Sequence, residues 1–322
     1  MRFHFVINPA AGRGLAVPLG EAVIGSLRAE GAEATSYVTK AAGDGAAHVR
    51  DLAEHACDVL VVMGGDGTLR EVVNARGGPP PWPVGIVPMG TANVVGRELR
   101  MPLDRRAPKI ANALRAGEAW PVDVLKLTRA DGTIEHAVAN TGIGLDAEVV
   151  HAVSEVRAGG VGGYAKWIRP IIESFSTFKF PTLRVTIDDH VTYAAGACVV
   201  QNARNYGGVF ALSPKAALDS GFMDVMIVRS RTHRSLFGIL TSMLLRRAQK
   251  NHDVKIVPSQ SVRLRSDREA RVQADGDPAG YTDLHVELVP KGLTLLRAPA
   301  RSHTWVRRSG RTAWFLRREK LV

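Results

Sequence analysis

The chain has 322 residues, 45% of them hydrophobic and 23% charged, which is an ordinary composition for a soluble globular protein and a length that predicts about two domains. No run of about 18 apolar residues occurs, which excludes a helix that spans a bilayer. The net charge of +11 favours phosphorylated ligands or anionic membranes as partners, whereas nucleic acid is disfavoured because no nucleic-acid motif accompanies the charge.

Residues 1–122 alternate strand and helix signals. Asp58 to Met63 is apolar without alternation, as expected for a buried strand of a parallel sheet, and Val84 to Val87 repeats this pattern. Further strands are predicted at Phe3–Asn8 and Ala34–Val38. Helices are predicted at Glu21–Glu30, Ala46–His55, Thr68–Asn74 and Ala92–Leu99. This order predicts an α/β domain with a doubly wound parallel sheet.

Residues 123–298 contain many short strand-like runs, which predict a mainly antiparallel β-sandwich. Turn signals such as Asp188-Asp189 and Asp275-Gly276 separate the runs. Two inserted helices are predicted, near Tyr164–Phe178 and Arg234–Gln249. The two cysteines, Cys57 and Cys198, adjoin apolar runs, which indicates buried free thiols and a reducing, cytoplasmic compartment.

Three strands of the first domain end in loops rich in glycine and small polar residues: Asn8–Gly14, Gly64–Thr68 and Pro88–Asn93. Ligands in open α/β sheets bind beyond the carboxyl ends of the strands, so these loops predict one crevice. Glycines let the backbone approach a ligand and direct N–H groups toward phosphate, and a helix N-terminus adds positive potential. The pattern therefore favours a phosphate-containing ligand.

Asp66 lies between glycines in the second loop. A carboxylate beside bound phosphate is unfavourable unless a metal ion bridges the two, as Mg²⁺ does in phosphoryl transfer. Asp66 is therefore a metal or catalytic candidate, although it could equally shape a turn. Thr68 and Glu71 match a capping box, which is a structural role. Neither the P-loop motif nor the dinucleotide-binding fingerprint occurs.

Seven segments, taken in order along nearly the whole chain, resemble the diacylglycerol kinase catalytic-domain family, which includes bacterial lipid kinases and the sphingosine and ceramide kinases. GGDGT alone is weak because NAD kinases resemble it, but the set is specific. The segments are NPAAGRG (Asn8–Gly14), GGDGTLREVVN (Gly64–Asn74), PMGTANVVGREL (Pro88–Leu99), VDVLKL (Val122–Leu127), NTGIGLDAEV (Asn140–Val149), SPKAALDSGFMDVMIV (Ser213–Val228) and VQADGDP (Val272–Pro278).

The resemblance implies an ATP-binding domain and a β-sandwich domain with the active site in the cleft between them, and Mg²⁺-dependent phosphorylation of a lipid hydroxyl. It implies that Asp277 is the general base and that Asp66 and Asp123 are metal-linked acids. A structural magnesium loop is implied at Ala217, Ser220 and Phe222. The implied ATP-binding residues are Asn8, Pro9, Ala10, Ala11, Gly12, Thr39, Gly64, Gly65, Asp66, Gly67, Thr68, Glu71, Gly90, Thr91 and Asn93.

Three positions depart from the family pattern. Val94 replaces a frequent Asp, Ser220 replaces a frequent metal-binding Asp, and Asp277 replaces a Glu. They motivate a second hypothesis, in which the chain is a non-catalytic nucleotide- or lipid-binding regulator of the same fold; NAD kinase is a third. Read without the family, Asp275-Gly276-Asp277 is a plain hairpin turn.

Residues 299–322 form a basic tail in which seven cations face one acid and aromatic residues are interleaved. Such a segment can lie on an anionic inner-membrane surface, or it can dock on its own protein with a solvated basic face. Arg246, Arg247 and Lys250 could join the membrane contact or simply end a helix. The Gly162–Phe178 segment could line an acyl-chain pocket or pack in the core. The sequence leaves open whether the protein forms a homodimer.

Overall fold

The computed structural model describes residues 1–158, 173–174, 178–207, 212–213, 216–244 and 247–299. No helix within these ranges is long and apolar enough to cross a membrane. The basic tail beyond residue 299, and nearly all of the helix predicted at Tyr164–Phe178, lie outside the described residues.

The first domain is built on four parallel strands in the order β2 (Glu33–Val38), β1 (Arg2–Ile7), β3 (Val59–Gly64) and β4 (Val84–Pro88). All six residues of β3 and all five of β4 are buried, as their unbroken apolar runs predict. The short helix η1 (Ala11–Arg13) follows β1. The longer helices are α1 (Ala16–Ala29), α2 (Asp44–Asp51), α3 (Asp66–Val73), α4 (Val94–Glu98) and α5 (Ala107–Arg115).

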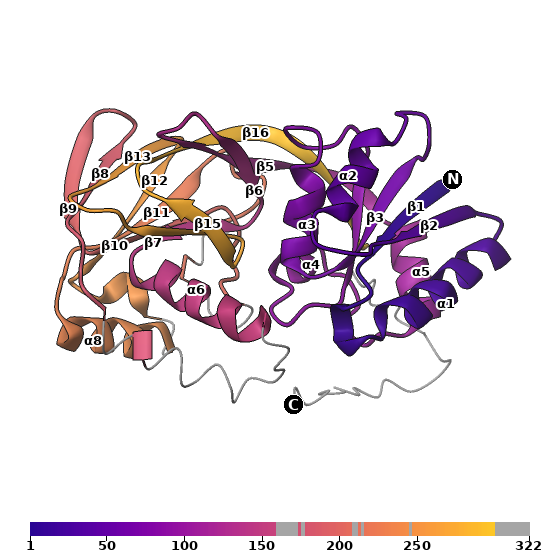
Figure 1. The fold of residues 1–322 in the computed structure, drawn as a ribbon, viewed down its shortest axis with the longest axis horizontal. Helices are drawn as coiled ribbons and strands as arrows, with labels where there is room; N and C mark the ends of the chain where they lie inside the picture. The colour runs from indigo at the N-terminus through magenta and orange to yellow at the C-terminus, as the bar shows by residue number, and fades with distance from the viewer. Residues whose placement is uncertain (159–172, 175–177, 208–211, 214–215, 245–246, 300–322) are drawn as a thin grey trace, which may run out of the picture.

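Helices cover both faces of this sheet (Figure 1). Ile7 of β1 points to α1, since a β-carbon at Gly20 would lie 2.7 Å from its Cδ1. Val6 points to the opposite face, where its Cγ1 would lie 3.3 Å from a β-carbon at Gly45 of α2. Helix α1 packs against α5, and α2 packs against α3. The prediction of a doubly wound parallel sheet is confirmed.

The second domain contains a six-stranded antiparallel sheet packed against strands of a second sheet. In spatial order the six strands are β12 (Val254–Ser259), β11 (Met223–Val228), β10 (Ala197–Gln201), β7 (Asn140–Ile143), β14 (Arg271–Ala274) and β15 (Asp277–Tyr281). The opposing strands are β5 (Glu118–Arg129), β6 (Ile134–Ala137), β8 (Leu183–Ile187), β9 (Val191–Ala195), β13 (Ser261–Ser266) and β16 (Leu284–Arg297). A core that includes Leu125, Val185 and Val225 fills the space between the sheets, as a sandwich requires.

The outer face of the six-stranded sheet carries α6 (Leu145–Ala158) and α8 (His233–Leu244), and η2 (Ala248–Lys250) follows α8 (Figure 1). The sequence predicted α8 but not α6. The turns at Asp188-Asp189 and Asp275-Gly276 are confirmed as hairpin turns between paired strands. Cys57 and Cys198 are buried and free, also as predicted.

Strands β5 and β16 connect the two domains. They pair with each other along their length except at a bulge between Val289 and Leu293, and Leu295 of β16 also pairs in parallel with Val84 of β4. One ten-stranded sheet therefore runs through both domains, with β16 spanning the top of the molecule in Figure 1. The domain boundary proposed near residue 122 lies inside β5.

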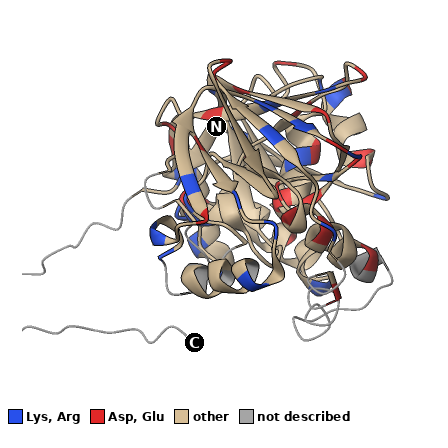
Figure 2. Cartoon of the chain, turned by 90° about the vertical axis from the view of Figure 1, so that its left-hand side faces the viewer, with Lys and Arg blue, Asp and Glu red and all other residues tan. Residues whose placement is uncertain are grey.

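Basic and acidic residues are interspersed on the face of the chain that Figure 2 displays. More than half of the net charge of +11 comes from residues 299–322, which carry seven cations and one acid. The charge excess is therefore concentrated in the tail.

Candidate functional site

A cavity of about 600 Å³ lies where the three glycine loops meet the β14–β15 hairpin. The structure thus brings residues from both domains to one site. The predicted residues that line it are Asn8, Pro9, Ala10, Thr39, Gly65, Asp66, Gly67, Thr68, Glu71, Gly90, Thr91 and Asp277. The lining residues that the sequence did not predict for the site are Lys40, Ala41, Ala42, Ala92 and Gly276, together with Asp275, which it predicted as part of a hairpin turn.

The second and third glycine loops touch through their backbones. A β-carbon at Gly90 would lie 2.7 Å from the α-carbon of Gly65, which is closer than real β-carbon contacts come. The amide of Met89 also donates to the carbonyl of Gly64 at 2.8 Å. Glycine is therefore required at this contact because backbone occupies the space of a side chain.

Four predicted ligand residues shape these loops from behind the cavity. Gly12 has a φ of +63°, and a β-carbon there would lie 2.3 Å from Cε of Met89; its neighbour Ala11 packs on the core. Asn93 closes the third loop by donating from Nδ2 to the carbonyl of Gly90 at 2.7 Å. Gly64 is crowded by the side chain of Thr68.

Asp66 joins the second loop to the third. Its two carboxylate oxygens accept the backbone N–H groups of Val94 and Val95, at 3.0 and 3.1 Å, where α4 begins. Burial raises the pKa of Asp66 to about 6, these two hydrogen bonds lower it, and the charges of Asp275 and Asp277 raise it further. The side chain of Val94 is 5% exposed and packs in the core. Asp66 therefore holds α4 in place, whichever other role it has.

The capping box predicted at Thr68 and Glu71 is wrong, because α3 begins at Asp66 and its N-cap is the extended residue Gly65. The two side chains instead bridge neighbouring elements. Nδ2 of Asn8 donates to Oγ1 of Thr68 at 3.2 Å, and the amide of Ala46 in α2 donates to Oε1 of Glu71 at 3.1 Å. These bonds connect the first loop and α2 to α3.

The Asp275-Gly276 turn presents Asp277 to the second glycine loop. Asp275 and Gly276 have φ values of +50° and +82°, and they link the paired residues Ala274 and Asp277. A β-carbon at Gly67 would lie 2.2 Å from Oδ2 of Asp277. The hairpin interpretation and the site interpretation of this motif are therefore compatible.

Asp275 anchors that hairpin. Its carboxylate accepts three backbone N–H groups, from Val138 at 2.8 Å, Ala139 at 2.7 Å and Asn140 at 3.0 Å, and the residue is 8% exposed. Burial raises the pKa of Asp275, which these three bonds and the charge of Arg70 partly counteract. Asp275 therefore serves as a positioning residue for Asp277.

The structure does not bring Asp123 to the cavity. Asp123 is 2% exposed and lies with the turn that contains Ala217, Ser220 and Phe222, at the junction of the two sheets. Its carboxylate accepts the N–H groups of Gly221 and Lys291. Across the described residues, no group of three or more His, Cys, Asp or Glu is arranged to hold a metal ion.

The loop after β2 contributes more to the cavity than the predicted residue Thr39. That loop, Thr39–Gly43, also follows a parallel strand at the same sheet edge, and it adds Lys40 to the cavity wall. Asp44 orders the loop by accepting the backbone N–H of Lys40 at 2.7 Å and the hydroxyl of Tyr37 at 2.9 Å. Lys40 thus places a cation in the cavity wall.

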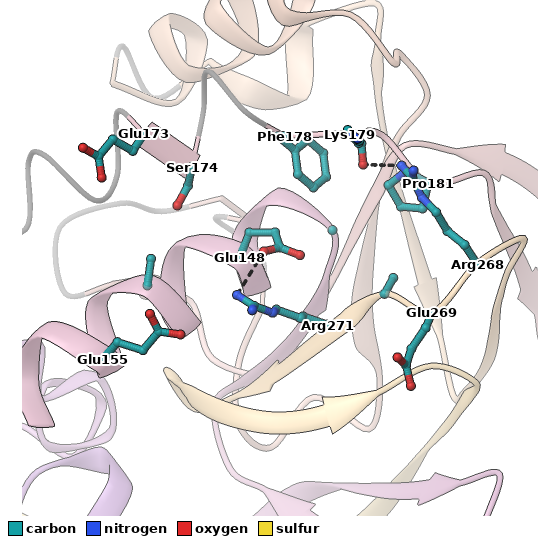
Figure 3. A pocket seen from close by; sticks show the side chains of 13 residues that line it. Glu148, Glu155, Glu173, Ser174, Phe178, Lys179, Pro181, Arg268, Glu269 and Arg271 are labelled. Atoms are coloured by element: carbon teal, nitrogen blue, oxygen red, sulfur yellow. Dashed lines mark hydrogen bonds and ion pairs between the residues drawn. The ribbon is translucent and has the colours of Figure 1, made fainter.

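A second cavity of about 720 Å³ lies in the second domain between α6 and the start of β14 (Figure 3). Glu148 and Glu155 approach it from α6, and Glu148 forms an ion pair with Arg271 at 3.2 Å. Phe178 is a buried apolar residue of its wall. The remaining lining residues are Gly144, Ala152, Glu173, Ser174, Lys179, Pro181, Arg268, Glu269 and Ala270.

Asp146 of α6 is a carboxyl group whose ionisation costs stability. Its Oδ2 accepts a hydrogen bond from Nε2 of Gln273 at 2.7 Å, and burial raises its pKa to about 6. The folded protein therefore binds this proton more tightly than the unfolded chain. The resulting stabilisation is complete below the unfolded pKa of about 3.9 and is lost as the pH rises through about 6.

Asp146→Asn is therefore expected to stabilise the protein at about pH 8 and to leave its stability unchanged at about pH 4. We expect the free energy of unfolding to rise by about 1–2 kcal/mol at the higher pH. This is less than the free energy that corresponds to the whole pKa shift, because Asp146 is only partly buried and solvent screens its charge. Denaturant unfolding at both pH values measures it, with the exposed Asp131→Asn as control. The same difference at both pH values would contradict the assignment.

The fold and cavity define a two-domain protein in which a parallel α/β sheet and an antiparallel sandwich share one site. The sequence model of the diacylglycerol kinase catalytic domain matches residues 2–127, and that of the YegS C-terminal NAD kinase beta sandwich-like domain matches residues 139–297. The chain therefore belongs to the diacylglycerol kinase catalytic-domain family.

Several relatives are similar over most of their length. A diacylglycerol kinase of Staphylococcus carnosus is 27% identical over 296 residues, which cover 89% of this chain and 94% of that protein. One of Staphylococcus saprophyticus is 27% identical over 281 residues, covering 87% and 90%. A crystal structure of a diacylglycerol kinase from Bacillus anthracis shares the fold, with a TM-score of 0.70, 22% identity, and coverage of 92% of this chain and 97% of that one.

Proposed function

We propose that the chain is an ATP- and Mg²⁺-dependent lipid kinase that phosphorylates a hydroxyl of diacylglycerol or a related lipid. The observation that carries this proposal is the contact of the Asp277 carboxylate with Gly67, at the point where the three glycine loops converge. Membership of the family, and relatives named diacylglycerol kinase, support the same activity.

In this proposal the three glycine loops and the N-terminus of α3 hold the nucleotide phosphates, and Lys40 adds positive charge. Asp277 accepts the proton of the lipid hydroxyl while that oxygen attacks the γ-phosphorus, and ADP leaves with the bridging oxygen. Phosphoryl transfer depends chiefly on positioning and charge neutralisation, so a wall with pre-ordered loops and one acceptor carboxylate suffices. Asp66 then acts by holding the second and third glycine loops in a fixed position relative to each other.

The wall residues fit a magnesium ion that arrives with the nucleotide. Mg²⁺ in kinase sites is held mostly by phosphate oxygens and water, with one or two carboxylates. Asp277 and Asp66 are the candidates on this wall. When bound, the ion would neutralise the charge that develops on the phosphates.

The lipid would be reached from a membrane surface, and we propose a cytoplasmic protein in peripheral contact with anionic lipid. The concentration of positive charge in residues 299–322 supports this contact. Arg247 and Lys250 are exposed beside the end of α8 and could add to it. We propose no nucleic-acid partner, and a homodimer is compatible with the proposal.

The second cavity does not suit the acyl chains. Four glutamates line it, and burying their carboxylates against hydrocarbon would be costly. Among the described residues of the predicted acyl-pocket segment, Phe178 is the one that contributes a buried apolar surface there. We therefore assign the acyl chains no place within this cavity.

The proposal is tested by incubating the protein with γ-labelled ATP, Mg²⁺ and mixed micelles that contain diacylglycerol, monoacylglycerol, sphingosine, ceramide or phosphatidylglycerol. NAD is assayed separately. We expect label in one lipid, and an imido analogue of ATP should suppress it by competing for the cavity. Label in NAD alone would identify an NAD kinase. Binding of ATP without any transfer would favour the non-catalytic regulator, for which the core position of Val94 is the structural argument.

A further inference from the structure

The turn from Ala217 to Phe222 is fastened to Asp123 at the junction of the two sheets. Asp123 lies in β5, and one of its carboxylate oxygens accepts the N–H of Gly221 in this turn at 2.7 Å. The other oxygen accepts the N–H of Lys291 at 2.9 Å, which lies in the bulge of β16. The amide of Asp123 also donates to the carbonyl of Leu218 at 2.6 Å. One buried carboxylate therefore connects β5, β16 and the turn.

The oxygen atoms of this turn do not fit the structural magnesium ion that the family resemblance implies. The carbonyl of Phe222 accepts the Ser220 hydroxyl at 2.7 Å, and the carbonyl of Ala217 accepts the Ser220 amide at 3.1 Å. Both oxygens of Asp123 accept N–H groups, and the residue is 2% exposed, whereas Asp66, which also accepts two N–H groups, faces a cavity. Magnesium requires near-octahedral oxygen ligation, and within the described part of the chain no group of three or more acidic or histidine side chains is arranged to supply it here.

The remaining carboxylate of the turn is also engaged. Asp219 accepts the indole N–H of Trp120 at 2.9 Å, and the guanidinium carbon of Arg297 lies 4.4 Å from the centre of that indole ring. A carboxylate at position 220 would add a negative charge beside Asp219 and Asp123, and that cluster would need a cation. Serine removes this charge and supplies a proton donor instead.

We propose that hydrogen bonds replace the structural cation in this protein, with the Ser220 hydroxyl donating to the Phe222 carbonyl and the backbone N–H groups of Gly221 and Lys291 neutralising Asp123. The inference depends on the proposed function in one respect: a lipid kinase of this family is expected to hold a structural cation at this turn. It makes the sheet junction independent of divalent ions, so among the described residues magnesium is proposed at the nucleotide alone.

The test is thermal unfolding of the nucleotide-free full-length protein in excess EDTA and in millimolar Mg²⁺, and it needs no enzymatic activity. Wild type and Ser220→Asn should respond equally little to Mg²⁺. Ser220→Ala should melt about 1–2 °C lower under both conditions because it loses one hydrogen bond. Ser220→Asp should melt lower still in EDTA and should recover in Mg²⁺.

Two results would overturn the proposal. One is a larger Mg²⁺-dependent rise in the melting temperature for wild type than for Ser220→Ala, since it would show that the native turn binds the cation. The other is a Mg²⁺-dependent rise in melting temperature that is no larger for Ser220→Asp than for Ser220→Asn. Restoring the negative charge at position 220 would then not restore a cation site. The melting temperatures decide the question whether or not the protein shows kinase activity.

Discussion

Asp277→Asn is expected to lower the rate of phosphate transfer to lipid by about 10²–10⁴-fold, the usual worth of a general base. Asparagine keeps the size of the side chain, and therefore its contact with Gly67, but it cannot accept the proton of the lipid hydroxyl. The Michaelis constant for ATP and the melting temperature should change little. Steady-state assays with the lipid that accepts label in the experiment proposed above, together with thermal unfolding, measure the three quantities.

Two further variants isolate the role of this carboxylate. Asp131→Asn changes an aspartate in another hairpin turn, outside the cavity, and should retain full activity. Asp277→Glu restores a base of the kind usual in the family and should retain more activity than Asp277→Asn. If Asp277→Asn transfers phosphate within about threefold of the wild-type rate, Asp277 is not the proton acceptor.

Gly67→Ala is expected to reduce the transfer rate by about 100-fold by displacing Asp277 without removing it, since misplacement by about 1 Å costs that much. The added β-carbon would lie 2.2 Å from Oδ2 of Asp277, and the three nearest atoms all belong to that flexible side chain. Gly67 also lies in the first turn of α3, where alanine favours the helix by up to about 1 kcal/mol. Activity should therefore fall while stability is maintained or rises.

The matched control is Gly25→Ala in α1, where a β-carbon meets no atom within 4 Å. It should keep full activity. In the double variant Gly67→Ala/Asp277→Asn, the loss should equal that of Asp277→Asn alone, because both changes act on one carboxylate. Additive losses would mean that Gly67 acts on the nucleotide rather than on Asp277.

Local patterns were sufficient for the parts of the fold that are determined locally. The unbroken apolar runs of β3 and β4 indicate buried parallel strands, and the glycine loops follow at the expected sheet edge. Asp275-Gly276 indicates a hairpin turn, which the structure contains. These features depend on backbone preferences and on burial of contiguous residues, which a single sequence displays directly.

Features that depend on distant contacts could not be predicted in this way. Helix α5 was missed because it is short and two of its four buried positions are alanines, which give a weak apolar signal. Thr68 and Glu71 fit a capping box locally, but Gly65 begins the helix and the two side chains bond to other elements. Asp123 does not line the cavity, and the partners that hold it, Gly221 and Lys291, are about 100 and 170 residues away along the chain, where a local pattern cannot reveal them.

The long pairing of β5 with β16 constrains how this protein moves during turnover. Two domains joined by a flexible linker can swing apart as rigid bodies, but here two long strands of one sheet run through both domains and hydrogen-bond to each other. The ladder is interrupted only at the bulge between Val289 and Leu293. We expect motion of one cavity wall against the other to be a small twist about that bulge, with nucleotide exchange accomplished by the glycine loops.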